Sequence, residues 1–241
     1  MAQVLCPAIE SFEADRMQTK SSNCALSVVA ISGAALLFFG TYFHPMSADP
    51  NAASAAFAEY AADHYWVATH LLQLCGFALM TAALVLLSRL LAGGAAAALA
   101  AVGMAGAIAG LAVATALQAV DGVALKAMVD AWAAAAEPDK AGLFHAAFAV
   151  RQVEVGLAAM TSWLSGVTVT LFGAALLIDR RFARWLGVLA IAGGIPTAVA
   201  GIVIAQDGFS ALAMMINMPA NILLLCWMIG LGIWTWRWRD E

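Results

Sequence analysis

The sequence has few charged residues, and its cysteines form no recognisable pairing pattern. Only 11% of its 241 residues are charged, whereas 64% are hydrophobic. A soluble domain carries about 25% charged residues, so this chain lacks the groups that would cover a water-facing surface. The net charge of −4, with no basic stripe, argues against nucleic acid as a partner. None of the 4 cysteines lies in a CxxC or CxxCH pattern, which argues against a zinc knuckle or a c-type haem attachment.

Several familiar membrane activities also lack their residues. The apolar runs contain no lysine for a retinal Schiff base and no carboxylate at mid-membrane depth for a proton relay. P-loop, GxSxG and HExxH motifs are missing, as are the histidine-rich boxes of a membrane di-iron hydroxylase. These absences narrow the function without defining it.

The main positive feature is a series of six apolar runs. Each has roughly 20 residues, enough to cross a hydrocarbon core as a helix, and none shows the alternation of a β-barrel strand. We therefore expect an all-α polytopic membrane protein, with a cytoplasmic tail at 1–23 and a lipid-embedded domain of six transmembrane helices at 24–239. The expected spans are Cys24–His44, Ala68–Leu87, Ala95–Thr115, Gly156–Ile178, Trp185–Ala205 and Leu212–Trp234.

Basic residues indicate how the chain is oriented. Eight of the 11 Lys and Arg residues fall on the side of the two termini. By the positive-inside rule this side is cytoplasmic, so we expect a multi-pass protein of the cell membrane with both termini inside. The eight are Arg16, Lys20, Arg89, Arg180, Arg181, Arg184, Arg237 and Arg239.

On the outer side we expect a helical cap, formed by residues 45–66 and 116–155. A short helix over Pro50–Asp63 would present Phe57 and Tyr60 on the membrane surface. The third and fourth spans would run past the membrane as an extended hairpin. Its turn would lie near Pro138, since proline suits a turn or the first position of a helix.

Glycines on the third and fifth spans allow close helix approach. Such small-residue faces predict packing between helices, and also a possible homo- or hetero-oligomer. These glycines are Gly103, Gly106 and Gly110 on the third span, and Gly187, Gly193, Gly194 and Gly201 on the fifth.

Polar residues converge at one depth near the outer boundary when about 20 residues are counted from each cytoplasmic end. We expect them to form one polar chamber, with His64 and His145 lying higher in the cap. The residues at the common depth are His44, His70, Gln118, Asp121, Arg151, Glu154, Asn217 and Asn221.

Imidazole is the commonest protein metal ligand, and nearby carboxylates can act as oxygen ligands or orient the imidazoles. The chamber therefore predicts a haem or transition-metal site. Its ligand-binding candidates are His44, His70, Asp121, Arg151, Glu154 and Asn217, and its candidate metal ligands are His44, His70, His145 and His64. Hydrogen-bonded histidines without any ligand are the alternative.

Arg151 and Glu154 are three residues apart and can pair along a helix. Asp121 would complete a three-member network across the extended hairpin. The network would act either as a structural clamp or as an anchor for an anion or ligand, for which arginine is well suited.

Two patches, Asp121–Lys126 (DGVALK) and Arg151–Leu157 (RQVEVGL), resemble a family of uncharacterised bacterial multi-pass membrane proteins known only as a domain of unknown function. The resemblance implies a bacterial cytoplasmic-membrane protein and supplies no activity. Three hypotheses therefore stand. The first is a protein that binds a cofactor or small ligand and is possibly redox-active. The second is a non-catalytic accessory subunit, and the third is an enzyme that uses a carboxylate–histidine pair on a membrane-soluble substrate.

Overall fold

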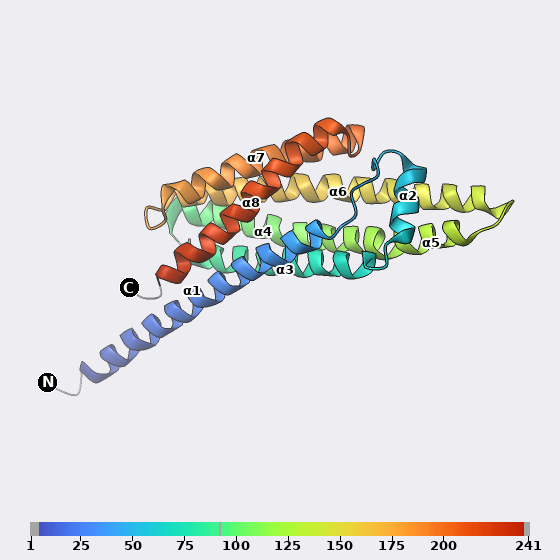
Figure 1. Ribbon diagram of the computed structural model, residues 1–241. Coiled ribbons are helices and arrows are strands. Elements are labelled where there is room, and N and C mark those ends of the chain that lie inside the picture. Colours follow the sequence, from blue (N-terminus) through green and yellow to red (C-terminus); the bar gives the residue numbers. More distant parts are fainter. Residues whose placement is uncertain (1–4, 92, 239–241) are drawn as a thin grey trace.

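The computed structural model describes residues 5–91 and 93–238, with side chains from residue 21 onward. All regular secondary structure in this part of the chain is helical (Figure 1). The long helices are α1 (Leu5–Tyr42), α3 (Trp66–Leu90), α4 (Gly94–Gln118), α6 (Asp139–Ile178), α7 (Arg184–Asp207) and α8 (Ala211–Arg237). The short ones are α2 (Ala53–Ala62), the π-helix η1 (Ala119–Leu125) and α5 (Lys126–Ala134).

Six helical stretches are long and apolar enough to cross a membrane, and the chain is a six-helix polytopic membrane protein. Large apolar side chains such as Val102, Ile202 and Ile222 are exposed on the bundle surface, where lipid tails would contact them. For most of the predicted tail at residues 1–23 the structure describes no side chains. Helix α1 begins within the tail, at Leu5.

The six long helices form a closed ring. Each packs on two neighbours, in the order α1, α3, α4, α6, α7, α8 and back to α1. Glycines make these contacts close: a Cβ at Gly103 would lie 3.0 Å from the ring of Phe172, and one at Gly193 would lie 2.7 Å from Leu224. Most glycines of the predicted packing faces therefore pack against other helices of the same chain. They do not indicate an oligomer.

The two ends of the ring differ. We call the end that carries Arg89, Arg181 and Arg237 the arginine end. There, short links join α3 to α4 and α6 to α7, and the Arg181 Nη2 donates to the Leu90 carbonyl at 2.6 Å. At the other end, the cap end, α4 continues through η1 and α5 to form the predicted extended hairpin with α6 (Figure 1).

The cap has its own apolar core, which corrects one prediction. Phe57 and Tyr60 on α2 are 0% and 5% exposed and pack with Trp66, Leu125 and Val129. They do not lie on the membrane surface as expected, because α2 turns its aromatic face toward α5 and α6. The helical pattern predicted α2 but not which neighbour would cover it.

Candidate metal centre

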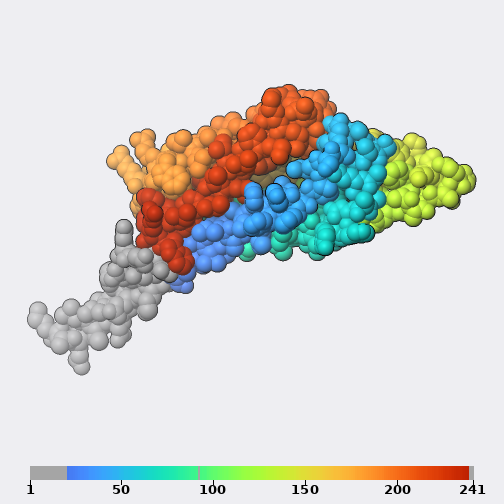
Figure 2. Space-filling view, viewed as in Figure 1, coloured from blue at the N-terminus to red at the C-terminus, as the bar shows by residue number. Residues whose placement is uncertain are grey.

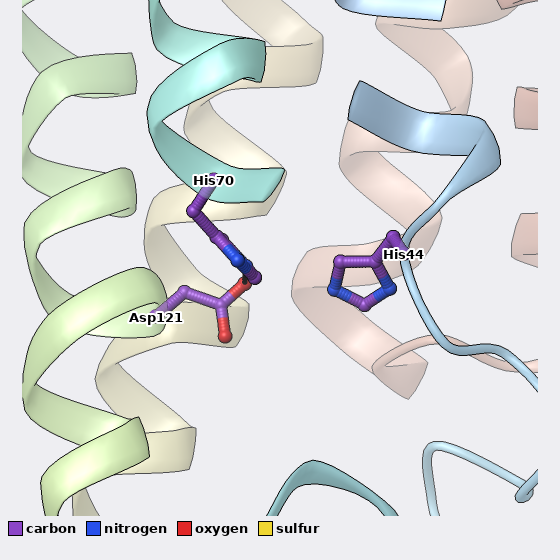
Figure 3. A group of neighbouring side chains, drawn as sticks. All are labelled: His44, His70 and Asp121. Atoms are coloured by element: carbon purple, nitrogen blue, oxygen red, sulfur yellow. Dashed lines mark hydrogen bonds and ion pairs between the residues drawn. The ribbon is translucent and has the colours of Figure 1, made fainter. Parts of the chain in front are cut away.

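The centre of the candidate site is a contact between α3 and η1 (Figure 3). His70, which is 2% exposed, places its Nε2 3.0 Å from Oδ2 of Asp121. Its other ring nitrogen, Nδ1, lies 2.7 Å from the carbonyl oxygen of Trp66, one turn earlier on α3. The ring is thus fixed from both sides.

His44 completes the group from α1. It follows the last turn of that helix and is half-buried, with its ring centroid 5.0 Å from that of His70 and 4.8 Å from that of Trp66. Its Nδ1 lies 2.9 Å from the carbonyl oxygen of Pro45, and its other ring nitrogen faces the His70–Asp121 pair (Figure 3). Burial lowers the pKa of the His44 imidazole, and the nearby His70 adds to this effect.

The backbone contacts assign the ring protons. A carbonyl oxygen can only accept, so Nδ1 of each histidine carries a proton and donates it. The Nε2 of a neutral His70 then points a lone pair at the Asp121 carboxylate, and two acceptors 3.0 Å apart repel each other. Either a proton held between His70 and Asp121 or a cation must lie there. The Oδ1 of Asp121 is also buried and has no hydrogen-bond partner among the described residues.

The backbone around Asp121 explains how it reaches His70. Residues Ala119–Leu125 form the wider turn of a π-helix, a feature common at functional sites. Gly122 lets this turn approach α3, because a Cβ there would lie 2.6 Å from the Cβ of His70. The indole Nε1 of Trp66 donates to the Asp121 carbonyl at 2.9 Å and ties α3 to the π-turn.

Tyr60 and Arg151 cover this group from the cap. The Tyr60 ring centroid lies 4.3 Å from that of Trp66, and burial raises the pKa of the Tyr60 hydroxyl to about 12. The Arg151 guanidinium stacks over Tyr60 at 5.7 Å and over Phe209 at 5.0 Å. Cation–π contacts of this kind hold the guanidinium against the aromatic rings beside the polar group.

Arg151 and Glu154 form the predicted ion pair on α6, and both side chains are buried. Arg151 also donates from Nη2 to the carbonyl oxygen of Pro50 at 3.4 Å. The pair therefore joins α6 to the segment before α2 and to Phe209. The clamp hypothesis had expected it to fix the third span against the fourth. Asp121 contacts His70 instead of closing the expected network with Arg151 and Glu154.

The remaining predicted site residues lie outside the group. His64 and His145 are exposed in the cap, and the candidate metal-binding group contains neither. Asn217 lies on α8, with its Oδ1 buried and without a hydrogen-bond partner among the residues described. Trp66 contacts both His70 and Asp121, and it is the residue of this site that the sequence did not reveal. Its only signal was its place at the start of an apolar helix, where tryptophan ordinarily marks the membrane interface.

The candidate metal-binding group consists of His44, His70 and Asp121. Each offers one ligand atom, and the three atoms lie within 4.8 Å of one another. Donors around a tetrahedral zinc ion are about 3.3 Å apart, so the widest-spaced pair must close by up to about 1.5 Å to bind one ion. Two imidazoles on opposite faces of one haem need ring centroids about 6 Å apart, more than the 5.0 Å observed. A single ion requires only that the side chains close in, whereas a haem requires the two rings to move apart and admit a macrocycle between them. The geometry therefore suits a single ion better than a haem.

Comparisons with protein-family models, with curated proteins and with solved structures found no match to this chain. The site must accordingly be interpreted from its own geometry.

Proposed function

We propose that this membrane protein binds one divalent transition-metal ion, Zn²⁺ or Fe²⁺, through the Nε2 atoms of His44 and His70 and the carboxylate of Asp121. The observation that carries the proposal is the pinning of both Nδ1–H groups by backbone carbonyls. That arrangement is typical of metal-ligating histidines, because it fixes the tautomer and leaves Nε2 free to bind.

Two nitrogens and one carboxylate form a donor set that suits iron(II) and zinc. Three protein ligands also leave coordination positions open, so that water or a substrate oxygen can bind the ion. The enzyme hypothesis depends on those open positions, whereas a non-catalytic subunit would need only the bound ion or none.

The test is the metal content of the purified protein, with and without incubation in Zn²⁺ or anaerobic Fe²⁺. About one ion per chain is expected for the wild type, and His44→Ala should weaken binding by more than about 100-fold. Asp121→Asn should behave similarly, although its amide can still donate to His70 and keep α3 and η1 together. Cobalt(II) substitution would report the donor set through its visible spectrum.

His64→Ala and His145→Ala are matched controls, because both remove an exposed histidine from the same end of the molecule. They should keep the full metal content. Wild-type protein that remains metal-free after incubation would overturn the proposal and leave a protonated His70–Asp121 ion pair as the explanation. A Soret band would show a haem in its place.

We also propose that the arginine end faces the cytoplasm of a bacterial cell, which places the metal site near the outer leaflet. The excess of Lys and Arg at that end supports this orientation. Alkaline phosphatase should be active when fused after residue 136 in the cap and inactive when fused at the C-terminus. The opposite pattern of activity would reverse the orientation.

A further inference from the structure

The ring of six helices encloses a cavity of about 440 Å³, within the range of small-molecule binding sites. It extends along α3 from Gln73 to Leu84, which is about 16 Å at the helical rise per residue. This length suits a chain-like molecule better than a compact one.

The cavity wall is apolar but carries unsatisfied hydrogen-bonding groups. No acidic or basic side chain lines it among the residues described. The buried wall atoms that lack a partner there are Gln118 Oε1, Thr161 Oγ1, Ser165 Oγ and Trp227 Nε1. Buried polar atoms are costly when unpaired. All four are covered by protein atoms. Rotation of these side chains toward the cavity would let a ligand with its own hydrogen-bonding atoms pair with them.

The cavity opens sideways between α1 and α8. At the arginine end the two helices are joined by a hydrogen bond between the hydroxyls of Ser27 and Thr235, 2.9 Å apart. Toward the cap end they diverge, and Figure 2 shows a hollow between them. On these two helices, Phe38, Tyr42 and Met218 are exposed and also line the cavity. Because these exposed residues belong to membrane-spanning helices, the opening of the cavity faces lipid.

We propose that this cavity binds an uncharged, single-chain lipid with a hydrogen-bonding head group, which enters from the bilayer between α1 and α8. The absence of charge on the described wall disfavours a phosphate or ammonium head, and the length of the cavity fits an acyl or isoprenoid chain. This lipid site goes beyond the proposed metal site and does not require it.

The polar end of the cavity lies close to the metal-binding group. Gln73 and Gln118, which hydrogen-bond to each other at 3.2 Å, stand three residues from His70 and Asp121 respectively. Three residues of helix correspond to about 4.5 Å. A lipid whose head group reaches this glutamine pair would therefore lie next to the metal ion, if both sites are filled.

The test uses a monoacylglycerol with a photoreactive diazirine in its chain, added to the full-length protein in nanodiscs. The comparison probe carries the same chain on a lysophosphatidic acid head. We expect labelling of wall residues by the uncharged probe and at least about fivefold less labelling by the charged one.

Gly110→Leu is the decisive variant. Gly110 lines the cavity, and a Cβ there would have nothing within 4 Å, so the new side chain begins in open space and takes up cavity volume. Labelling should fall about tenfold. Gly156→Leu is the matched control, because this glycine also has open space but is exposed on the outside of α6. Its labelling should match the wild type.

Thr161→Val tests the head-group contacts, since it removes a hydroxyl while keeping the side-chain shape. Affinity for the monoacylglycerol should fall about 3- to 10-fold. Wild-type labelling in Gly110→Leu, or equal labelling by the charged probe, would overturn the proposal and indicate ordinary bilayer lipid. The labelling is repeated after metal has been removed with a chelator. Unchanged labelling would show that the lipid site does not depend on the metal site.

Discussion

At the scale of single residues, Gly122 is the position on which the candidate metal centre depends. It is one of the few glycines that lie against a polar side chain, and it permits the 3.0 Å contact between His70 and Asp121. A methyl group at this position would push the π-helical turn away from α3.

Gly122→Ala should therefore weaken metal binding by about 10- to 100-fold, as changes to groups supporting a ligand do. Overpacking of about 1–3 kcal/mol should also outweigh the roughly 1 kcal/mol gained in helix propensity. Metal titration and thermal unfolding in detergent would measure both effects. Gly142→Ala, in an open and exposed position of α6, is the control and should be slightly stabilising. Equal metal affinity in the two variants would contradict this role for Gly122.

Sequence reasoning found some of these residues and missed how others act. Counting residues along the spans correctly placed His44, His70 and Asp121 at a common depth, because helical rise is regular. The residue count could not show that Asp121 faces His70. That contact depends on the π-helix, which rotates every later side chain about the helix axis. The hydrophobic pattern contains no sign of that extra residue per turn.

At the scale of helices and their links, the Arg151–Glu154 pair holds the cap on the bundle. Both side chains are buried, and Arg151 reaches Pro50, Tyr60 and Phe209. Breaking a buried pair from one side leaves a charge without compensation, which costs more than removing both partners.

Arg151→Met alone should lower the free energy of unfolding by about 3–5 kcal/mol, whereas Arg151→Met combined with Glu154→Met should recover most of that loss. Thermal or denaturant unfolding of Arg151→Met, of Glu154→Met and of the double variant gives the coupling free energy between the two side chains directly. A double variant that is less stable than either single one would show that the pair stabilises the fold in its own right.

The arginine end has a smaller ionic contact, between Asp179 and Arg181 in the link after α6. Hydrogen bonds from the Arg181 side chain lower the pKa of Asp179 below its usual value. A carboxylate with a lowered pKa stabilises the fold above its unfolded pKa and loses that effect as the pH falls through the folded value.

Asp179→Asn should therefore reduce stability at pH 7, by less than about 1 kcal/mol because Arg181 is exposed. The difference from wild type should shrink as the pH falls below about 4. Unfolding curves at pH 7, 5 and 3 would measure it. A difference that stays constant over this range would assign the effect to the lost helix-end geometry and not to charge.

At the scale of the whole molecule, six helices of mostly Ala, Leu and Gly close around a space that they do not fill. Sequence analysis predicted the spans and the extended hairpin, because length and hydropathy decide these. It did not predict the ring order or the cavity. Both depend on which face of each helix meets its neighbour, and helices that are apolar all round carry little information about facing.

The cavity makes a prediction about stability. Gly110→Leu should raise the unfolding temperature of lipid-free protein, because leucine favours the helix by roughly 1 kcal/mol over glycine and buries apolar surface. Monoacylglycerol should then raise the unfolding temperature of the wild type but not that of the variant, since only the wild type can gain stability from the bound ligand. Thermal scans with and without the lipid would check this, and equal shifts in both proteins would contradict it.

The divergence of α1 and α8 carries a consequence for membrane sidedness. The two helices touch at the arginine end and part toward the cap, so the opening lies on the side of the cap-end leaflet. Lipids of that leaflet can diffuse straight in, whereas those of the opposite leaflet must first flip. A cell with different lipids in its two leaflets would thus present this protein with only one of the two pools.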